Sequence, residues 1–269
     1  MTKYRILESG GQILGALFLA ASLAQAQPTP PPVPHEPATD GKMVLTRGIE
    51  MYEQRDYTGA LGAFKNAAEA GNIEAIMYLG IMYAAGQGTA QSYPTALAWF
   101  NRAAAKGDGQ AMCNLGIMYY QGLGVRRQYD EALRWFRNSA ATGNAQAMFN
   151  VGVAYRDGLG VLADYGEAMG WFRRAADGRN AAAMNAIGVM FQKGQGVATD
   201  YGEALSWFQK GADAGSRTAM YNIGVLYEKG LGVDVDRRQA EEWYQKAANA
   251  DDSDAAPEPA NDLKSPAQR

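Results

Sequence analysis

The sequence predicts an all-α protein made of stacked helix pairs, and three observations lead to this prediction. A Trp-aromatic dipeptide returns every 36 residues, all five tryptophans lie on that period, and helix-capping residues recur at the same spacing. A fixed period of this length is typical of repeat arrays, in which one unit cannot bury its apolar face without its neighbours. The tryptophans are Trp99, Trp135, Trp171, Trp207 and Trp243, each followed by Phe or Tyr.

The composition excludes several classes of function. The chain has 269 residues and a formal net charge of -3, so its composition gives no electrostatic reason to expect nucleic-acid binding. Cys113 is the only cysteine and His35 the only histidine, and His35 lies in a proline-rich stretch. Zinc sites built on histidine, Ser-His-Asp triads and Cys-His pairs each need a histidine near the chemistry. We therefore expect no nucleic-acid partner, no metal and no cofactor.

The N-terminus predicts export. Residues 1–26 contain two basic residues, an apolar run and the tripeptide Ala24-Gln25-Ala26, which together predict a signal peptide cleaved after Ala26. An uncleaved anchor helix is the alternative, although the apolar run is shorter than the about 20 residues that a membrane span needs. We expect the mature protein to be periplasmic or secreted, with no stable membrane span after cleavage.

Two further segments are predicted to lie outside the packed array. Residues 27–41 are rich in proline and are predicted to form an extended linker, which is either a spacer or a ligand for a groove that binds polyproline II helices. Residues 251–269 are rich in Asp, Pro and Ala and are predicted to be a disordered tail.

Each unit is interpreted as two helices. The first follows an N-cap position, since Asn, Asp and Ser side chains accept backbone N–H groups there, and it ends before a glycine suited to the left-handed C′ conformation. A glycine inside this helix costs about 1 kcal/mol against alanine, which indicates that another helix passes close by. The N-cap positions are Asn72, Asp108, Asn144, Asn180 and Ser216; the interior glycines are Gly80, Gly116, Gly152, Gly188 and Gly224; the terminal glycines are Gly86, Gly122, Gly158, Gly194 and Gly230.

The second helix also begins at a predicted cap and carries the Trp-aromatic pair. Three capping boxes are expected, Asp164 with Glu167, Asp200 with Glu203 and Asp236 with Gln239. Such carboxylate pairs resemble acid–base dyads, but their recurrence favours capping. The tryptophans follow a small alanine by three residues, so we expect them to form the structural core between helices, with the interior glycines. Asp56, Ser92 and Gln128 occupy the same cap position in earlier units.

The pattern resembles the Sel1-like repeat family, a relative of the tetratricopeptide repeat. The residues that carry the resemblance are 147–155 (AMFNVGVAY), 158–161 (GLGV) and 164–172 (DYGEAMGWF). Five such units cover residues 75–250, starting near 75, 111, 147, 183 and 219, while residues 42–74 look like a tetratricopeptide repeat. The resemblance implies a right-handed α-solenoid of antiparallel helix pairs, whose first helices line a concave groove for a protein or peptide partner.

The resemblance implies candidate partner-binding residues on the first helices, where two rows vary between units. The alternative is that these rows are ordinary solvated surface. Asn114, Asn150 and Asn222 share a further position, and their amides are expected either to bind a partner's backbone or to bond to the next repeat. Cys113 is expected to be an inert thiol. The candidates are Met77, Tyr78, Tyr120, Phe149, Arg156, Gln192, Tyr221 and Glu228.

The sequence thus favours a non-enzymatic scaffold or adaptor that regulates an envelope signalling or assembly complex. The alternative is a cell-wall-ligand binder or a β-lactamase-like enzyme, as the resemblance implies for disulfide-rich secreted members of the family. This chain lacks their paired cysteines and contains no Ser-x-x-Lys, which the serine β-lactamase mechanism needs.

Overall fold

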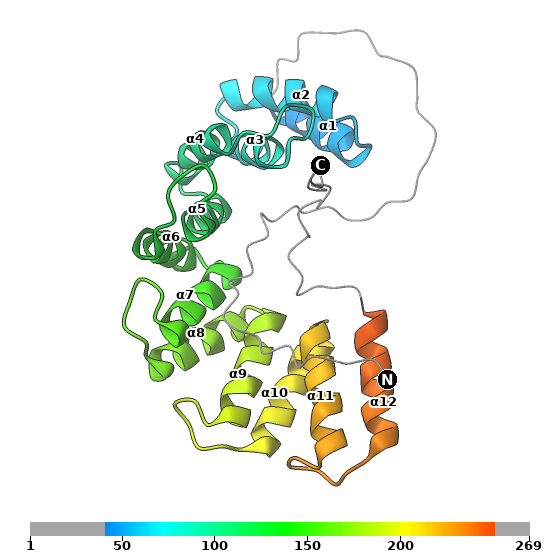
Figure 1. Cartoon of the computed structure of the whole chain (residues 1–269). Coiled ribbons are helices and arrows are strands. Elements are labelled where there is room, and N and C mark those ends of the chain that lie inside the picture. The colour runs from blue at the N-terminus through cyan, green and yellow to red at the C-terminus, as the bar shows by residue number, and fades with distance from the viewer. Residues whose placement is uncertain (1–40, 251–269) are drawn as a thin grey trace, which may run out of the picture. The chain divides into compact units, whose positions relative to one another are not determined.

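The computed structural model describes residues 41–250, which form twelve α-helices and no β-strand (Figure 1). The described residues divide into two compact units, 41–144 and 145–250. The predicted signal peptide, the tail and all but the last residue of the predicted linker lie outside the described residues. The fold is an all-α repeat solenoid, as the sequence predicted.

Each unit contains three helix pairs, and within a unit each helix packs against the next one along the chain. The first helices begin two residues before the positions from which the sequence counted its repeats, and α1 begins at Gly41, the last residue assigned to the linker. The first unit contains α1 (Gly41–Glu53), α2 (Tyr57–Glu69), α3 (Ile73–Ala85), α4 (Tyr93–Ala104), α5 (Gly109–Gln121) and α6 (Tyr129–Ala141). The second contains α7 (Ala145–Asp157), α8 (Tyr165–Asp177), α9 (Ala181–Lys193), α10 (Tyr201–Asp213), α11 (Arg217–Lys229) and α12 (Arg237–Asn249).

The first helices begin at side-chain caps. The Asn72 side chain accepts the Ala75 N–H at 3.0 Å, and the Asn180 side chain accepts the Ala183 N–H at 2.8 Å. Asp108 and Ser216 cap α5 and α11 in the same way. These caps satisfy backbone donors that have no partner within the first turn of a helix.

The second helices use only half of the predicted capping box. Asp164 Oδ1 accepts the Glu167 N–H at 3.0 Å, as expected. The N–H of Asp164, however, donates to the backbone oxygen of Tyr155 at 2.8 Å, so Glu167 does not need to satisfy it. This second bond ties the loop back to the first helix, and the same arrangement recurs at Asp200 and Asp236.

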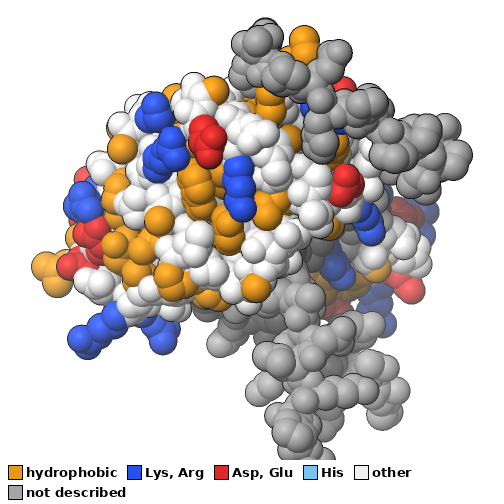
Figure 2. Space-filling view, turned by 90° about the horizontal axis from the view of Figure 1, so that it is seen from above, with side chains coloured by type: hydrophobic (Ala, Val, Ile, Leu, Met, Phe, Trp, Pro, Cys, Tyr) orange, Lys and Arg blue, Asp and Glu red, His pale blue; other side chains and the backbone are white. Residues whose placement is uncertain are grey.

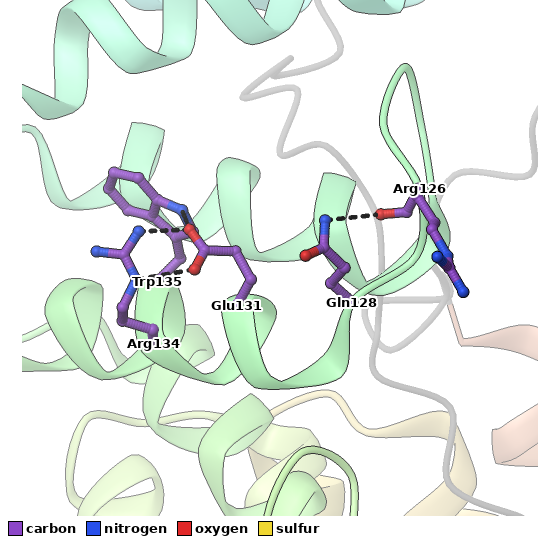
Figure 3. Close-up of polar contacts among 5 residues, drawn as sticks. All are labelled: Arg126, Gln128, Glu131, Arg134 and Trp135. Atoms are coloured by element: carbon purple, nitrogen blue, oxygen red, sulfur yellow. Dashed lines mark hydrogen bonds and ion pairs between the residues drawn. The ribbon is translucent and has the colours of Figure 1, made fainter.

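One expected cap, at Gln128, is not formed. Its backbone has φ -145° and ψ 104°, close to the -147° and 108° of Asp164, but its side chain makes no cap hydrogen bond. Gln128 Nε2 instead donates to the Arg126 backbone oxygen at 3.5 Å (Figure 3). A glutamine side chain is one methylene longer than asparagine, and preferred N-caps are short.

The core is built from the second residue of each Trp-aromatic pair. Phe100, Phe136, Phe172 and Phe208 are at most 1% exposed, whereas the tryptophans are only half-buried. The expectation that the tryptophans fill the core is therefore corrected, because they lie at its edge. Each phenylalanine ring instead packs on an interior glycine of the preceding first helix, and Tyr244 does so on Gly224.

The loop glycines join consecutive pairs within a unit. Gly196 has φ +71°, and a β-carbon there would lie 2.6 Å from Tyr165 Cβ, at the start of α8. The Gly-x-Gly-Val segment therefore forms a turn, and its second glycine also makes room for the previous helix pair. None of the helices within residues 41–250 combines the length and the apolar character needed to cross a membrane.

Candidate functional site

The accessible face of the first helices in the second unit is formed by α9 and α11, which pack directly against each other. Half-buried side chains follow one another along these helices at helical spacing. On α9 they are Asn185, Val189 and Gln192, and on α11 they are Tyr221, Asn222 and Val225. Glu228, Lys193 and Lys229 continue the same face and are exposed.

Asn185 and Asn222 form a hydrogen bond across this face. Asn222 Nδ2 donates to Asn185 Oδ1 at 2.8 Å, and both side chains are half-buried. For Asn222, this is the bond to a neighbouring repeat that was one of the two interpretations of its row. Asn185 was missed in the sequence, although it lies 36 residues after Phe149 and belongs to the same variable row.

The other two asparagines of that row are inaccessible. Asn114 and Asn150 are 0% exposed, and the Nδ2 group of each has no hydrogen-bond partner. Their Oδ1 atoms accept only long bonds, from Gln110 at 3.4 Å and from Gln146 at 3.3 Å. Because no partner reaches a fully buried amide, Asn114 and Asn150 do not bind a partner's backbone in this conformation.

An aromatic pair closes the C-terminal end of the face. The rings of Tyr221 and Tyr244 lie 5.1 Å apart, and the Tyr244 hydroxyl donates to Glu228 Oε2 at 3.0 Å. Burial, and then the bond to the Glu228 carboxylate, raise the pKa of Tyr244 above its usual range. The Tyr244 hydroxyl therefore stays protonated and donates its hydrogen to the Glu228 carboxylate.

Two candidates on α7 are held by local contacts. The Arg156 guanidinium bonds the Asp157 carboxylate at 2.8 Å and lies 5.9 Å from the centre of the Phe172 ring. Phe149 is only 6% exposed and packs 5.6 Å from the same ring. The expectation that Phe149 lies on an accessible surface is therefore corrected: it belongs to the core around Phe172.

In the first unit the candidate partner-binding side chains pack against neighbouring residues of the same unit. Tyr78 stacks on Phe64 at 4.7 Å between ring centres, and burial raises the pKa of Tyr78. Met77 is half-buried against the core, and Tyr120 is half-buried with its ring 5.3 Å from Tyr129. Cys113, from the same row as Met77, is fully buried, and this burial raises the pKa of its thiol to about 12.

A second variable surface, at the loops, was missed in the sequence. The two residues after each Gly-x-Gly-Val segment, or its counterpart in the first loop, are exposed and differ from loop to loop. Leu162 is 89% exposed and Val235 is 61% exposed. Variation on the repeat period was the available signal. The pairs are Ala90-Gln91, Arg126-Arg127, Leu162-Ala163, Ala198-Thr199 and Asp234-Val235.

Charged groups on the second helices hold the half-buried indoles. Lys210 Nζ lies 4.0 Å from the centre of the Trp207 ring, and Lys246 and Arg174 lie 4.1 Å from those of Trp243 and Trp171. The arrangement on α6 is different: Glu131 binds Arg134 and also accepts Trp135 Nε1–H at 2.9 Å (Figure 3). The bond from Arg134 lowers the pKa of Glu131.

The described residues contain no group of three or more His, Cys, Asp or Glu side chains suited to a metal ion. Figure 2 shows hydrophobic, basic and acidic side chains together on the face that is seen from above. An open depression at the C-terminal end of the second unit is lined by Met220, Glu242, Gln245, Lys246, Asn249 and Ala250. The arrangement therefore suits non-covalent recognition by hydrogen bonds and packing on the first helices.

Comparison with known protein families identifies the repeat. A family model described as Sel1 repeat matches residues 73–108, 109–144, 145–180, 181–216 and 218–252. Among curated proteins none matches the chain.

Solved structures agree with that family model. The Sel1 repeat protein from Oxalobacter formigenes is 33% identical, with a TM-score of 0.72 over 76% of this chain and 83% of that chain. The protein c5321, a protective antigen of uropathogenic Escherichia coli strains with an SLR fold, is 33% identical, with a TM-score of 0.71. That match covers 78% of this chain and 46% of c5321, so this chain spans less than half of c5321. The immunity protein Pa5087 from Pseudomonas aeruginosa is 17% identical, with a TM-score of 0.53 over 80% of this chain and 84% of that chain, and shows the fold alone.

Proposed function

The chain belongs to the Sel1 repeat family, and from this premise we propose that it is a non-enzymatic scaffold that binds protein partners on the first-helix face. The Sel1 repeat fold generally serves protein interactions, and its members are typically non-catalytic. The observation that carries the proposal is the contrast between two sets of residues. The interior glycine and the aromatic ring packed on it recur in every repeat, while two positions on the first helices differ between repeats: Asn185 is equivalent to Tyr221, and Gln192 to Glu228.

This contrast has a physical basis. A solenoid needs identical contacts between its repeats to stack, so the buried positions cannot specify a partner. Side chains that differ between repeats and reach solvent are free to match one. Asn185, Gln192 and Tyr221 have this property, and they combine hydrogen-bonding groups with an aromatic surface.

Site-specific photo-cross-linking in cells tests where the partner binds. A photoreactive amino acid replaces Gln192 on α9 in the full chain, and Gln209, exposed on α10 of the same unit, is the matched control position. We expect a protein adduct from position 192 and none from position 209. An adduct from position 209 alone, or from neither position, would contradict the proposal.

We further propose that the protein is exported and works in the periplasm or outside the cell, on an envelope signalling or assembly complex. The apolar run and Ala24-Gln25-Ala26 support export. Cell fractionation with N-terminal sequencing tests this, and we expect the mature chain to begin at Gln27. A chain that keeps its N-terminus in the cytoplasmic fraction would exclude it.

The absence of catalysis is testable with purified full-length protein. No residue pattern in the chain supports β-lactamase chemistry, because Ser-x-x-Lys is absent and the only histidine is His35. We expect no turnover of nitrocefin above a heat-denatured control, and sustained turnover would overturn the non-enzymatic assignment.

A further inference from the structure

The amide pair on α9 and α11 leaves most of its hydrogen-bonding groups unused. Asn222 Nδ2 gives one hydrogen to Asn185 Oδ1, and no other side-chain hydrogen bond joins either residue to the rest of residues 41–250. Asn185 therefore keeps its whole NH2 group as a donor, and Asn222 keeps its carbonyl oxygen as an acceptor. Both side chains are only half-buried, so these unused groups are accessible to a partner.

The free groups match the backbone N–H and C=O of one residue in an extended chain, because these two groups point to the same side of a strand. The C=O accepts from Asn185, and the N–H donates to Asn222. A helical partner has already used these backbone groups in its own hydrogen bonds. The amide pair therefore selects an extended segment rather than a helix.

The surroundings of the pair add apolar contacts and positive charge. Val189 and Val225 are half-buried about one turn further along α9 and α11. Lys193 and Lys229 occupy equivalent positions at the ends of these helices, are exposed, and form no ion pair within the described residues. Glu228, exposed on the same face, accepts a bond from the neutral Tyr244 hydroxyl and remains an acidic neighbour of Lys229.

The spacing of these groups defines the ligand. Asn185 and Lys193 are eight residues apart on α9, a rise of about 12 Å at 1.5 Å per residue. An extended chain covers that distance in about four residues, at roughly 3.3 Å each. An acidic side chain three or four residues from the bound residue is therefore within reach of Lys193 or Lys229.

We propose that α9 and α11 form a binding site for an extended acidic segment of a partner protein. Asn185 and Asn222 bind the backbone C=O and N–H of one of its residues, Val189 and Val225 contact its side chains, and Lys193 and Lys229 bind its carboxylates. The site rests on the proposed protein-binding function and deepens it. The equivalent position to Asn185 is Met77 or Cys113 in earlier repeats, so the amide pair belongs to this part of the chain.

The probe is a random dodecapeptide library displayed on phage and selected against the immobilised full chain. We expect the selected peptides to be acidic, and their synthetic copies to bind in fluorescence anisotropy. The variant with Asn185→Ala and Asn222→Ala should bind about tenfold more weakly, which is the effect of losing one or two neutral hydrogen bonds. Asn101→Ala is the control, because Asn101 is exposed on α4 and bonds only to Leu97 of its own helix.

Backbone recognition is tested by methylating the peptide nitrogens one at a time. At one position, N-methylation should weaken binding to the wild-type chain about tenfold and leave binding to the double variant unchanged, as expected for two coupled groups. Lys193→Gln with Lys229→Gln should also reduce binding and its salt dependence. Circular dichroism and thermal unfolding of every variant verify that the fold is kept.

Other outcomes are equally informative. Selection of neutral or helical peptides, no enrichment over bare support, or equal binding to the double variant would overturn the extended-segment site. The protein-binding function would still stand if position 192 cross-linked to a protein in cells. Loss of both results would remove the function as well.

Discussion

The ring of Phe172 lies so close to Gly152 that a β-carbon at Gly152 would sit 2.6 Å from two of its carbon atoms. Phe172 is fully buried, so the missing side chain at Gly152 is what allows α8 to pack on α7. The same relationship joins Phe136 to Gly116 and Phe208 to Gly188. The helix pair is therefore defined by a glycine and a phenylalanine from different helices.

Gly152→Ala should destabilise the protein by about 1–3 kcal/mol, the usual range for overpacking a core, even though alanine favours the helix. Urea unfolding followed by circular dichroism measures the change. Gly170→Ala on α8 is the matched control, because Gly170 is also inside a helix but has nothing within 4 Å of its would-be β-carbon. That control should gain about 0.5–1 kcal/mol, and a loss at both positions would contradict the packing role of Gly152.

Phe172→Ala should cost about 3–5 kcal/mol, because it empties a fully buried site. Trp171→Ala, next to it, should cost roughly half as much, since the indole is only half-buried and its outer face carries Arg174. Equal losses in the two melting curves would place the tryptophan in the core after all.

Gln128→Asp should stabilise the protein by about 1 kcal/mol. The backbone at Gln128 already has the conformation that Asp164 uses as a cap, and the Glu131 N–H is the donor that an aspartate there would accept. The reverse change, Asp164→Gln, should cost a similar amount. Thermal unfolding of both variants tests the pair, and a loss of stability in Gln128→Asp would contradict the assignment.

Cys113 should react very slowly with iodoacetamide at pH 8 in the native protein. Burial raises the pKa of its thiol to about 12, so the reactive thiolate is scarce at that pH, and the side chain is fully shielded. Labelling in guanidinium chloride should be fast, and mass spectrometry reports both rates because the chain has one cysteine. Fast labelling of the native protein would show that α5 opens locally.

The structure confirmed those sequence predictions that rest on local hydrogen bonds. Asn72, Asp108 and Asp164 cap the helices expected of them, because an N-cap depends only on residues three or four positions away. The left-handed glycines after the first helices follow for the same reason. The cap predicted at Gln128 was wrong, because the repeat period marks the position of a cap but the length of the side chain decides whether it forms one.

The candidate site was predicted less well. Variation along the first helices pointed to Gln192 and Tyr221, both of which reach solvent, but also to Phe149, which the fold buries. Position within a repeat does not determine exposure, because the neighbouring helices that cover a side chain come from other repeats.

The sequence by itself therefore determined the helix pairs, their period and their ends, since the caps, glycines and apolar spacing act within one repeat. Only the tertiary structure decided that Phe172, and not Trp171, fills the core. It also decided that Asn185 meets Asn222. The physical reason is the same in both cases: these contacts depend on how one helix is rotated and placed against another, and that geometry follows from the packing of whole repeats.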